Sequence, residues 1–255
     1  MRLYAILAGG ERADWAALDP FSPHVGTKVV LPYFFYLIEH PQGRVLFDTG
    51  AHPSLASDPR SRLGDEADNW EILMTENDGV VPKLAELGVR AEDIDHVVLS
   101  HLHYDHCGGI EFLPNAVFHV QRAELEFARK PPVYQAGLYV PADFGHPVNW
   151  HEIDGDHDLF GDRTVRIIAT TGHTPGHQSL LAQLPGQPII LVGDAAYLPE
   201  TMAARHLPSV VWRPDEMVAS WERLENLATE TGAQMLFTHD IGYQRNLRTA
   251  PDFYA

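Results

Sequence analysis

A six-residue segment carries most of the side chains in this sequence that are suited to binding a metal. It contains three histidines and one aspartate, namely His101, His103, Asp105 and His106. Neutral imidazole and carboxylate are the ligands that zinc and similar divalent ions prefer. The segment follows the apolar run at residues 96–99, which predicts a buried strand, so the four side chains lie on a loop that leaves a strand end. This pattern predicts a metal site at that end.

Four ligands on one short loop cannot all bind a single ion. His101 and His103 are expected to point one way, and Asp105 and His106 the other, which predicts two adjacent metals. Further ligands must then come from elsewhere in the chain. The following Gly108-Gly109 pair allows the backbone to turn sharply and to pass close to the site.

Three strand ends in the second half of the chain supply candidates for the remaining ligands. His173 follows the apolar run at residues 167–170, Asp194 follows residues 189–192, and His239 follows residues 235–237. The expected ligand sets are His101, His103 and His173 for one ion, Asp105, His106 and His239 for the other, and Asp194 as a bridge between the two ions.

Other polar residues near these segments are expected to have supporting roles. His177 shares a motif with His173 and is assigned to orienting or structural duty, and His119 alternates with apolar neighbours and is predicted to be a packed strand residue. Asp48 follows another predicted strand beside Gly50. It either orients a ligand imidazole or caps a turn, and the sequence leaves both readings open.

The chain supplies two runs of strands, each followed by helices. Residues 29–38 and 45–47 flank a Pro/Gly turn and predict a β-hairpin. Helices are predicted over residues 81–87, 122–129 and 215–229, and later strands over residues 148–153, 158–160, 165–170, 178–184, 188–192 and 234–237. This order predicts two β-sheets packed face to face with helices outside. Residues 9–26, 51–79 and 134–150 are predicted to be loops or irregular segments.

Composition narrows the class of protein. The chain has 255 residues, enough for one large domain or two fused halves. It carries 35 acidic and 18 basic residues, a net charge of −17, which disfavours nucleic acid and an anionic membrane as partners. One cysteine excludes an intrachain disulfide. We find neither a leader nor a membrane-spanning run, so we expect a cytoplasmic enzyme.

The motifs named above resemble those of the metallo-β-lactamase superfamily. His-x-His-x-Asp-His at residues 101–106, the later Gly172-His173, Asp194 and His239 occur in that family's order. The resemblance covers the chain from about Val29 to His239. It implies an αββα sandwich, a single hydrolase domain over residues 1–255, and metals at one edge of the sheets.

Finer features resemble the N-acyl-homoserine lactonases, a quorum-quenching group. Asp194-Ala195-Ala196-Tyr197 is similar to their Asp-x-x-Tyr motif, in which the Tyr contacts the substrate carbonyl. Residues 120–124, 171–180 and 237–240 are also similar to that group. The alternative is that Tyr197 is a buried aromatic residue that follows a strand and only packs against its neighbours.

The resemblance implies a lactonase with two divalent metal ions. We expect zinc, although this ligand set also accepts Mn, Fe or Co. A hydroxide held between the ions would attack the lactone carbonyl, Tyr197 would stabilise the oxyanion, and Asp105 would pass a proton to the departing alkoxide. A homodimer is expected from the resemblance alone. The acyl chain requires apolar contacts, for which the candidates are Phe34, Phe35, Trp70, Met74, Phe144 and Trp150.

Two other functions remain open at this point. One is hydrolysis of another lactone or ester, such as a γ-lactone, a vitamin-derived lactone or a thioester of the glyoxalase II kind. The other is a redox or non-catalytic metalloprotein. Redox members of the superfamily replace the second His of the first motif with Glu and add a flavin domain, so His103 and the chain length argue against that reading.

Overall fold

The apolar segment around residues 29–38 forms the long strand β2 (Lys28–His40), which is buried on both faces over most of its length. In the computed structural model, which describes residues 1–255, Phe34 and Tyr36 face a second sheet, whereas Phe35 and Leu37 face the helices. Successive side chains of a strand point to opposite faces, so a strand between two apolar layers has a continuous apolar sequence. β2 therefore lies inside a layered structure.

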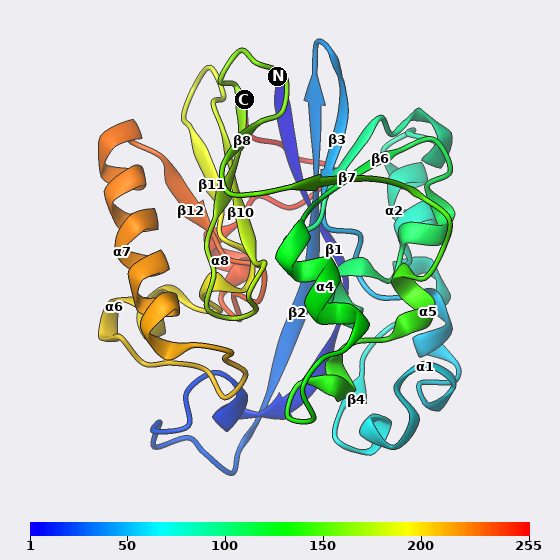
Figure 1. Ribbon diagram of the computed structural model, residues 1–255, viewed down its shortest axis with the longest axis vertical. Helices are drawn as coiled ribbons and strands as arrows, with labels where there is room; N and C mark the ends of the chain where they lie inside the picture. Colours follow the sequence, from blue (N-terminus) through cyan, green and yellow to red (C-terminus); the bar gives the residue numbers. More distant parts are fainter.

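Two mixed sheets pack face to face (Figure 1). The seven-stranded sheet has the order β4-β1-β2-β3-β5-β6-β7, and the five-stranded sheet has the order β12-β11-β10-β9-β8. The strands of the first sheet are β1 (Arg2–Asp14), β2, β3 (Gly43–Phe47), β4 (Glu71–Ile72), β5 (His96–Val98), β6 (Val117–Gln121) and β7 (Asn149–Ile153). Those of the second are β8 (His157–Asp158), β9 (Val165–Ala169), β10 (Gln178–Ala182), β11 (Ile189–Leu191) and β12 (Gln234–Leu236).

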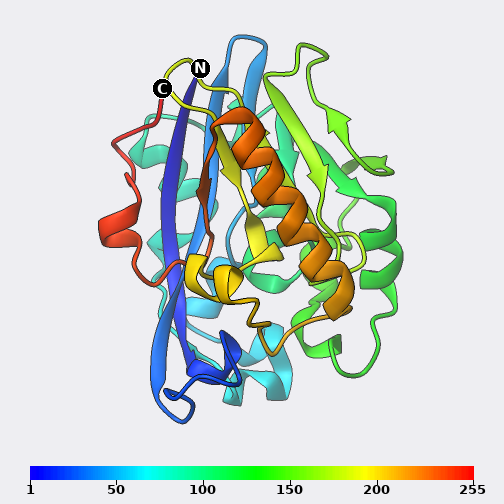
Figure 2. The same ribbon diagram turned by 90° about the vertical axis from the view of Figure 1, so that its left-hand side faces the viewer.

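Helices cover the two outer faces (Figures 1 and 2). Helices α2 (Val80–Glu86), α4 (Arg122–Arg129) and α5 (Pro141–Phe144) pack on the seven-stranded sheet, and α6 (Pro199–Ala204) and α7 (Pro214–Thr231) pack on the five-stranded sheet. The shorter helices are α1 (Arg60–Leu63), α3 (Tyr104–Cys107) and α8 (Tyr243–Asn246). None of the helices has the length and apolar character needed to cross a membrane. The predicted αββα sandwich is confirmed.

Helix α7 illustrates how the sequence determines an element and its packing. Pro214 occupies the first turn, where its missing N–H is not needed, and Gly232 ends the helix in a left-handed conformation with φ 69°. Met217, Trp221 and Leu224 repeat at helical spacing and are fully buried against the five-stranded sheet. The apolar stripe therefore holds α7 over the five-stranded sheet, which contains β11, the strand that precedes Asp194.

The prediction of a loop over residues 9–26 was wrong in its first part. Strand β1 continues to Asp14, because its backbone stays paired with β2 from Gly10 opposite Pro32 to Asp14 opposite Lys28. The pairing is irregular between Leu7 and Gly10, where Gly9 adopts φ 86°. The glycines that suggested a loop accommodate this irregularity. Residues 134–150 also contain α5, and α6 was not anticipated.

Candidate metal centre

All seven expected ligand side chains lie at one edge of the two sheets. His101, His103, Asp105 and His106 follow β5, whereas His173, Asp194 and His239 follow β9, β11 and β12 respectively. β9 and β11 both run antiparallel to β10, and β12 runs parallel to β11, so the three strands point the same way. Their carboxyl ends therefore meet at the same edge, opposite the loop that follows β5. Within groups of three, ligand atoms from side chains far apart in the sequence are brought within 4.8 Å of one another in this way.

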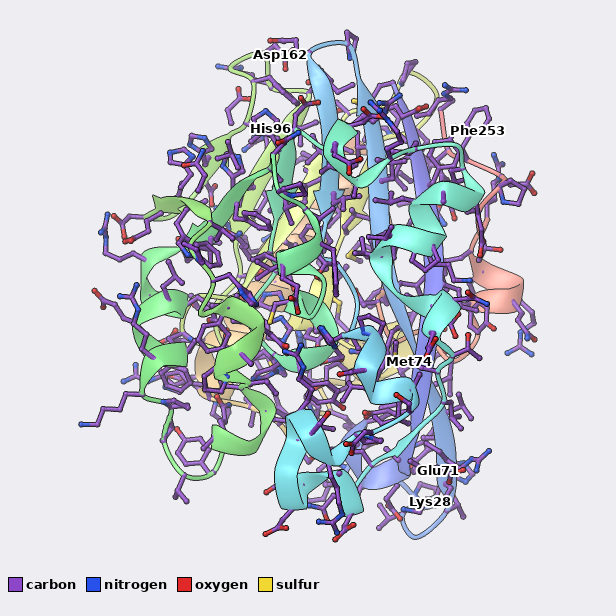
Figure 3. All side chains as sticks on the ribbon, turned by 90° about the vertical axis from the view of Figure 1, so that its right-hand side faces the viewer. Lys28, Glu71, Met74, His96, Asp162 and Phe253 are labelled. Carbon is purple, nitrogen blue, oxygen red and sulfur yellow. The ribbon has the colours of Figure 1, made fainter.

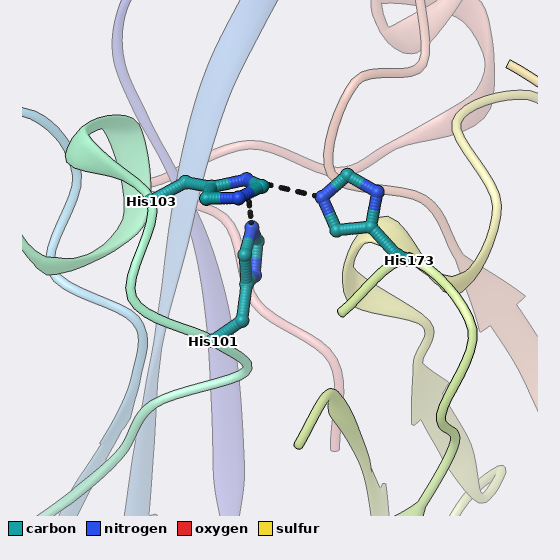
Figure 4. A group of neighbouring side chains, drawn as sticks. All are labelled: His101, His103 and His173. Atoms are coloured by element: carbon teal, nitrogen blue, oxygen red, sulfur yellow. Dashed lines mark hydrogen bonds between the residues drawn. The ribbon is translucent and has the colours of Figure 1, made fainter. Parts of the chain in front are cut away.

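The first group consists of His101, His103 and His173 (Figure 4). The Nδ1 atom of His103 lies 2.9 Å from Nε2 of His101 and 3.1 Å from Nε2 of His173. The rings of His101 and His173 are fully buried. Three imidazole nitrogens converging from two separate loops are suited to binding one divalent ion.

The second group consists of Asp105, His106 and His239. The Oδ2 atom of Asp105 lies 3.3 Å from Nε2 of His106 and 3.5 Å from Nε2 of His239. Asp105 and His106 belong to the short helix α3, and the ring of His106 lies beside that of His101, with centroids 4.2 Å apart. The two groups adjoin, since His101, His106 and Asp194 also lie within 4.8 Å of one another.

The carboxylate of Asp194 lies between the two groups. Its Oδ1 atom is 3.3 Å from Nε2 of both His106 and His239, whereas its Oδ2 atom is 3.6 Å from Nε2 of His173. One oxygen faces each group. This geometry is the one that a carboxylate bridging two ions requires.

The polar atoms at the centre of the site lack other partners. Nε2 of His106 and Oδ1 of Asp194 are buried without a hydrogen bond. Buried polar atoms are nearly always paired, because an unpaired one costs about 1–3 kcal/mol. Metal ions bound by this nitrogen and this oxygen would satisfy both atoms, so the residues present fit a dinuclear metal centre.

Asp48 orients one of the imidazoles. Its Oδ2 atom lies 2.8 Å from Nδ1 of His106, and its carboxylate also accepts hydrogen bonds from the backbone N–H and the hydroxyl of Ser100, at 2.6 and 2.8 Å. Asp48 is fully buried and adopts the left-handed conformation, φ 62°, which is uncommon for a residue other than glycine. The structure therefore favours the orienting role over turn capping.

Other ring nitrogens are fixed by the backbone. Nδ1 of His173 donates to the carbonyl of Val210 at 3.1 Å, and Nδ1 of His239 donates to the carbonyl of Pro32 at 2.9 Å. When Nδ1 carries the proton and donates it, Nε2 keeps a free lone pair, and this tautomer can bind a metal through Nε2. Both Nε2 atoms then point toward Asp194.

His177 has the supporting place expected for it. Its Nε2 accepts the backbone N–H of Asp194 at 2.9 Å, while its Nδ1 donates to the carbonyl of Thr170 at 3.1 Å. Burial lowers the pKa of His177 to about 3, so the ring is neutral and able to accept this bond. A Cβ on Gly193, whose φ is 60°, would lie only 2.8 Å from Nε2 of His177. Glycine at this position permits the close approach.

A small pocket opens beside the two groups. Its apolar lining includes Leu31, Trp70, Leu138, Tyr197 and Val210. Trp70 is the one acyl-chain candidate from the sequence that lines it.

The other candidates lie elsewhere. Phe34 packs between the sheets and Phe35 packs beneath the helices. Phe144 and Trp150 line a separate hollow beside α4, and Met74 packs in the neighbouring apolar cluster.

Tyr197 lies directly beside the ligands. Its ring centroid is 5.2 Å from that of His239 and 5.8 Å from that of His173. Burial and the charge of Asp194 raise the pKa of Tyr197 well above its usual value, so its hydroxyl stays protonated and can donate a hydrogen bond.

Glu11 is a site residue that the sequence did not indicate. It lines the pocket, and its carboxylate accepts hydrogen bonds from the hydroxyls of Tyr33, at 2.6 Å, and Tyr104. Burial raises the pKa of Glu11 to about 7. Glu11 lies in the part of β1 that the sequence assigned to a loop, where no local pattern places it near the metal ligands.

Replacing Asp48 by Asn should weaken metal binding. The substitution keeps the shape of the side chain but removes the charge that faces Nδ1 of His106, and loss of such a partner costs about 10–100-fold in metal affinity. Competition with a chromophoric chelator measures the change. Asp252→Asn, at an exposed position, is the control and should bind metal like the wild type. Wild-type affinity in Asp48→Asn would contradict the orienting role.

Known proteins resemble this chain in sequence. The family model of the metallo-beta-lactamase superfamily matches residues 29–239. N-acyl homoserine lactonase AttM of Azorhizobium caulinodans is 37% identical over 235 residues, with 90% of this chain and 89% of the relative covered. N-acyl homoserine lactonase AiiA of Bacillus thuringiensis subsp. kurstaki is 30% identical over 256 residues, with 99% and 98% covered.

A solved structure extends the likeness to the whole fold. The structure of N-acyl homoserine lactone hydrolase with the product N-hexanoyl-L-homoserine bound at its catalytic metal centre has a TM-score of 0.89 and 29% identity, and the match covers 99% of this chain and 98% of that one. The sequence motifs, the two packed sheets and these matches agree, and the chain belongs to the metallo-beta-lactamase superfamily.

Proposed function

We propose that this protein is a metal-dependent lactonase that opens the ring of N-acyl-homoserine lactones with two zinc ions. The observation that carries the proposal is the position of Asp194, with one oxygen toward each group of ligands and Tyr197 three residues further along the chain. The relatives named N-acyl homoserine lactonases support the choice of substrate, since they match this chain over nearly its full length.

The ligands divide between the two ions. His101, His103 and His173 would hold one ion, Asp105, His106 and His239 the other, and Asp194 would contact both. When bound, the ions would supply a hydroxide nucleophile near neutral pH and would polarise the lactone carbonyl. Five imidazole and two carboxylate side chains are donors that suit zinc, which is the metal we propose.

Two side chains of the protein would act on the reacting atoms directly. The protonated hydroxyl of Tyr197 would donate to the oxyanion that forms when the carbonyl carbon is attacked, a contribution of about 3 kcal/mol for a well-placed donor. The side chain of Asp105 is 14% exposed and lines the pocket, so it reaches both the ligands and the substrate. It would accept the proton carried by the attacking hydroxide and pass it to the alkoxide that leaves when the ring C–O bond breaks.

The pocket accounts for the rest of the substrate. Leu31, Trp70, Leu138 and Val210 form an apolar lining next to the polar ligands. An acyl chain placed against these residues would leave the lactone ring beside Asp105 and Tyr197. The product would be an open-chain N-acyl homoserine.

Substitutions of Asp194 and Tyr197 test the chemistry. We expect Asp194→Asn to lose bound metal and nearly all activity, and Tyr197→Phe to keep its metal but to lower kcat about 100-fold through the lost oxyanion donor. Proton release on opening of N-hexanoyl homoserine lactone measures both. Tyr134→Phe, at an exposed tyrosine, is the control and should match the wild type.

The same assay tests the substrate class. Addition of a chelator should abolish turnover of the homoserine lactone. Simple γ-lactones and thioesters should be turned over less efficiently in kcat/KM. A thioester that outperforms every homoserine lactone would replace the proposed function, and full activity in Tyr197→Phe would remove that residue from the chemistry.

A pair of tryptophan variants tests the placement of the acyl chain. Trp70→Ala removes apolar surface from the pocket and should lower kcat/KM for a ten-carbon acyl chain about tenfold, with a smaller effect on a short chain. Trp150→Ala is the matched control, because Trp150 lies beside α4 and not at the pocket. Equal effects of the two substitutions on long-chain substrates would show that the acyl chain of the substrate does not lie against Trp70.

A further inference from the structure

A second cluster of imidazoles lies apart from the metal centre. It consists of His119 on β6, His151 on β7 and His157 on β8, each with a ring nitrogen within 4.8 Å of those of the other two. None of the three belongs to the seven ligands described above. His96, labelled in Figure 3, borders the cluster, with its Nδ1 3.1 Å from Nε2 of His119.

Strand pairing brings these histidines together. β6 and β7 are parallel, and their register sets His119 directly opposite His151, so both side chains leave the sheet on the same side. His157 comes from the other sheet, where it pairs with Ile167 of β9. β7 and β8 are the edge strands of their respective sheets, so the cluster spans the two sheets at one margin.

The connection between β7 and β8 is held in place. Gly155 in this turn donates its N–H to Oε1 of Gln121 at 2.9 Å, and its carbonyl accepts from Nε2 of the same side chain at 2.8 Å. Gln121 is itself bonded to Gln178 of the second sheet at 2.9 Å. Because the turn is fixed on both sheets, His151 and His157 are presented to each other in a defined geometry.

The pair His119 and His151 has the nitrogen spacing of the first group of the metal centre. Nδ1 of His119 lies 3.0 Å from Nδ1 of His151, compared with 2.9 and 3.1 Å among His101, His103 and His173. A tetrahedral zinc with bonds of about 2.0–2.1 Å separates its ligand nitrogens by about 3.3 Å. The ring of His157 has its centroid 5.3 Å from that of His151 and 6.3 Å from that of His119, so movement of this ring toward the pair would admit an ion.

The state of the rings also suits a metal. His119 is 3% exposed, and both of its ring nitrogens face other imidazoles. A buried imidazole surrounded in this way stays neutral, and neutral imidazole is the form that binds transition metals. His151 is exposed, so the cluster can be reached from solvent.

We propose that His119, His151 and His157 form a third metal site, which binds one zinc ion and links the two sheets. The fourth position of a tetrahedral ion would be open to water beside the exposed His151. Two ligands come from one sheet and one from the other, so an ion bound here would hold the margins of the sheets together. This role is structural and independent of lactone hydrolysis.

A comparison of the zinc content of the wild type and of histidine variants tests this proposal. Wild-type holoenzyme, His157→Gln and His24→Gln are dialysed against the same micromolar zinc solution, and zinc per chain is measured by mass spectrometry. The wild type should hold one more zinc than His157→Gln. His24→Gln, at an exposed histidine outside the cluster, should match the wild type. The ligands of the dinuclear centre are the same in all three proteins, so the difference does not depend on the occupancy of that centre.

A second readout uses the link between the sheets. Added zinc should raise the Tm of the wild type and of His24→Gln more than that of His157→Gln, because only the first two hold the additional ion. His151→Gln, at an exposed position, provides a second variant if His157→Gln does not fold. Equal zinc content in the wild type and in the cluster variant, or equal shifts of Tm, would overturn the proposal.

Discussion

The buried carboxylate of Asp194 is the feature on which the site depends. It lies between two groups of imidazoles, is 2% exposed, and has an oxygen atom without a hydrogen-bond partner. Its backbone is held by His177, whose close approach requires glycine at position 193. A bare carboxylate buried in this way would be costly, whereas one shared by two cations is stabilised by their charge. The surrounding residues hold the carboxylate of Asp194 in place.

The layered architecture makes this convergence possible. β9, β11 and β12 run in the same direction and deliver His173, Asp194 and His239 to one edge, while the loop after β5 brings its ligands from the other sheet. The two sheets are held together by an apolar layer between them, which includes Phe34, Tyr36 and Leu180. Helices close the outer faces and leave the edge free for the pocket. The position of each candidate ligand is therefore a consequence of packing far from the site.

Much of this arrangement could be predicted from local sequence. Apolar runs that end in His or Asp are visible without a structure, and the four ligands at residues 101–106 require further ligands from elsewhere. The sequence leaves two roles open for Asp48, orienting an imidazole or capping a turn. Its bonds to His106 and Ser100 favour the orienting role. The fold class followed from the order of strands and helices and from the family resemblance.

The remaining features depend on long-range pairing that local sequence does not encode. Glu11 reaches the pocket because β1 continues past Gly9 and Gly10 along β2, against the local turn signal. The aromatic candidates for the acyl chain differ little in sequence, and only packing separates Trp70 from Phe34 and Trp150. His119 reads as a packed strand residue, and the register of β6 with β7 reveals the imidazoles around it.

Anomalous diffraction at the zinc edge from crystals of the metal-loaded protein is the most direct test of the central claim. Two peaks are predicted beside Asp194, one within about 2.0–2.2 Å of nitrogens of His101, His103 and His173, and the other at the same distance from Asp105, His106 and His239. Each should contact a carboxylate oxygen of Asp194. A single peak, or two peaks of which only one contacts Asp194, would contradict the account.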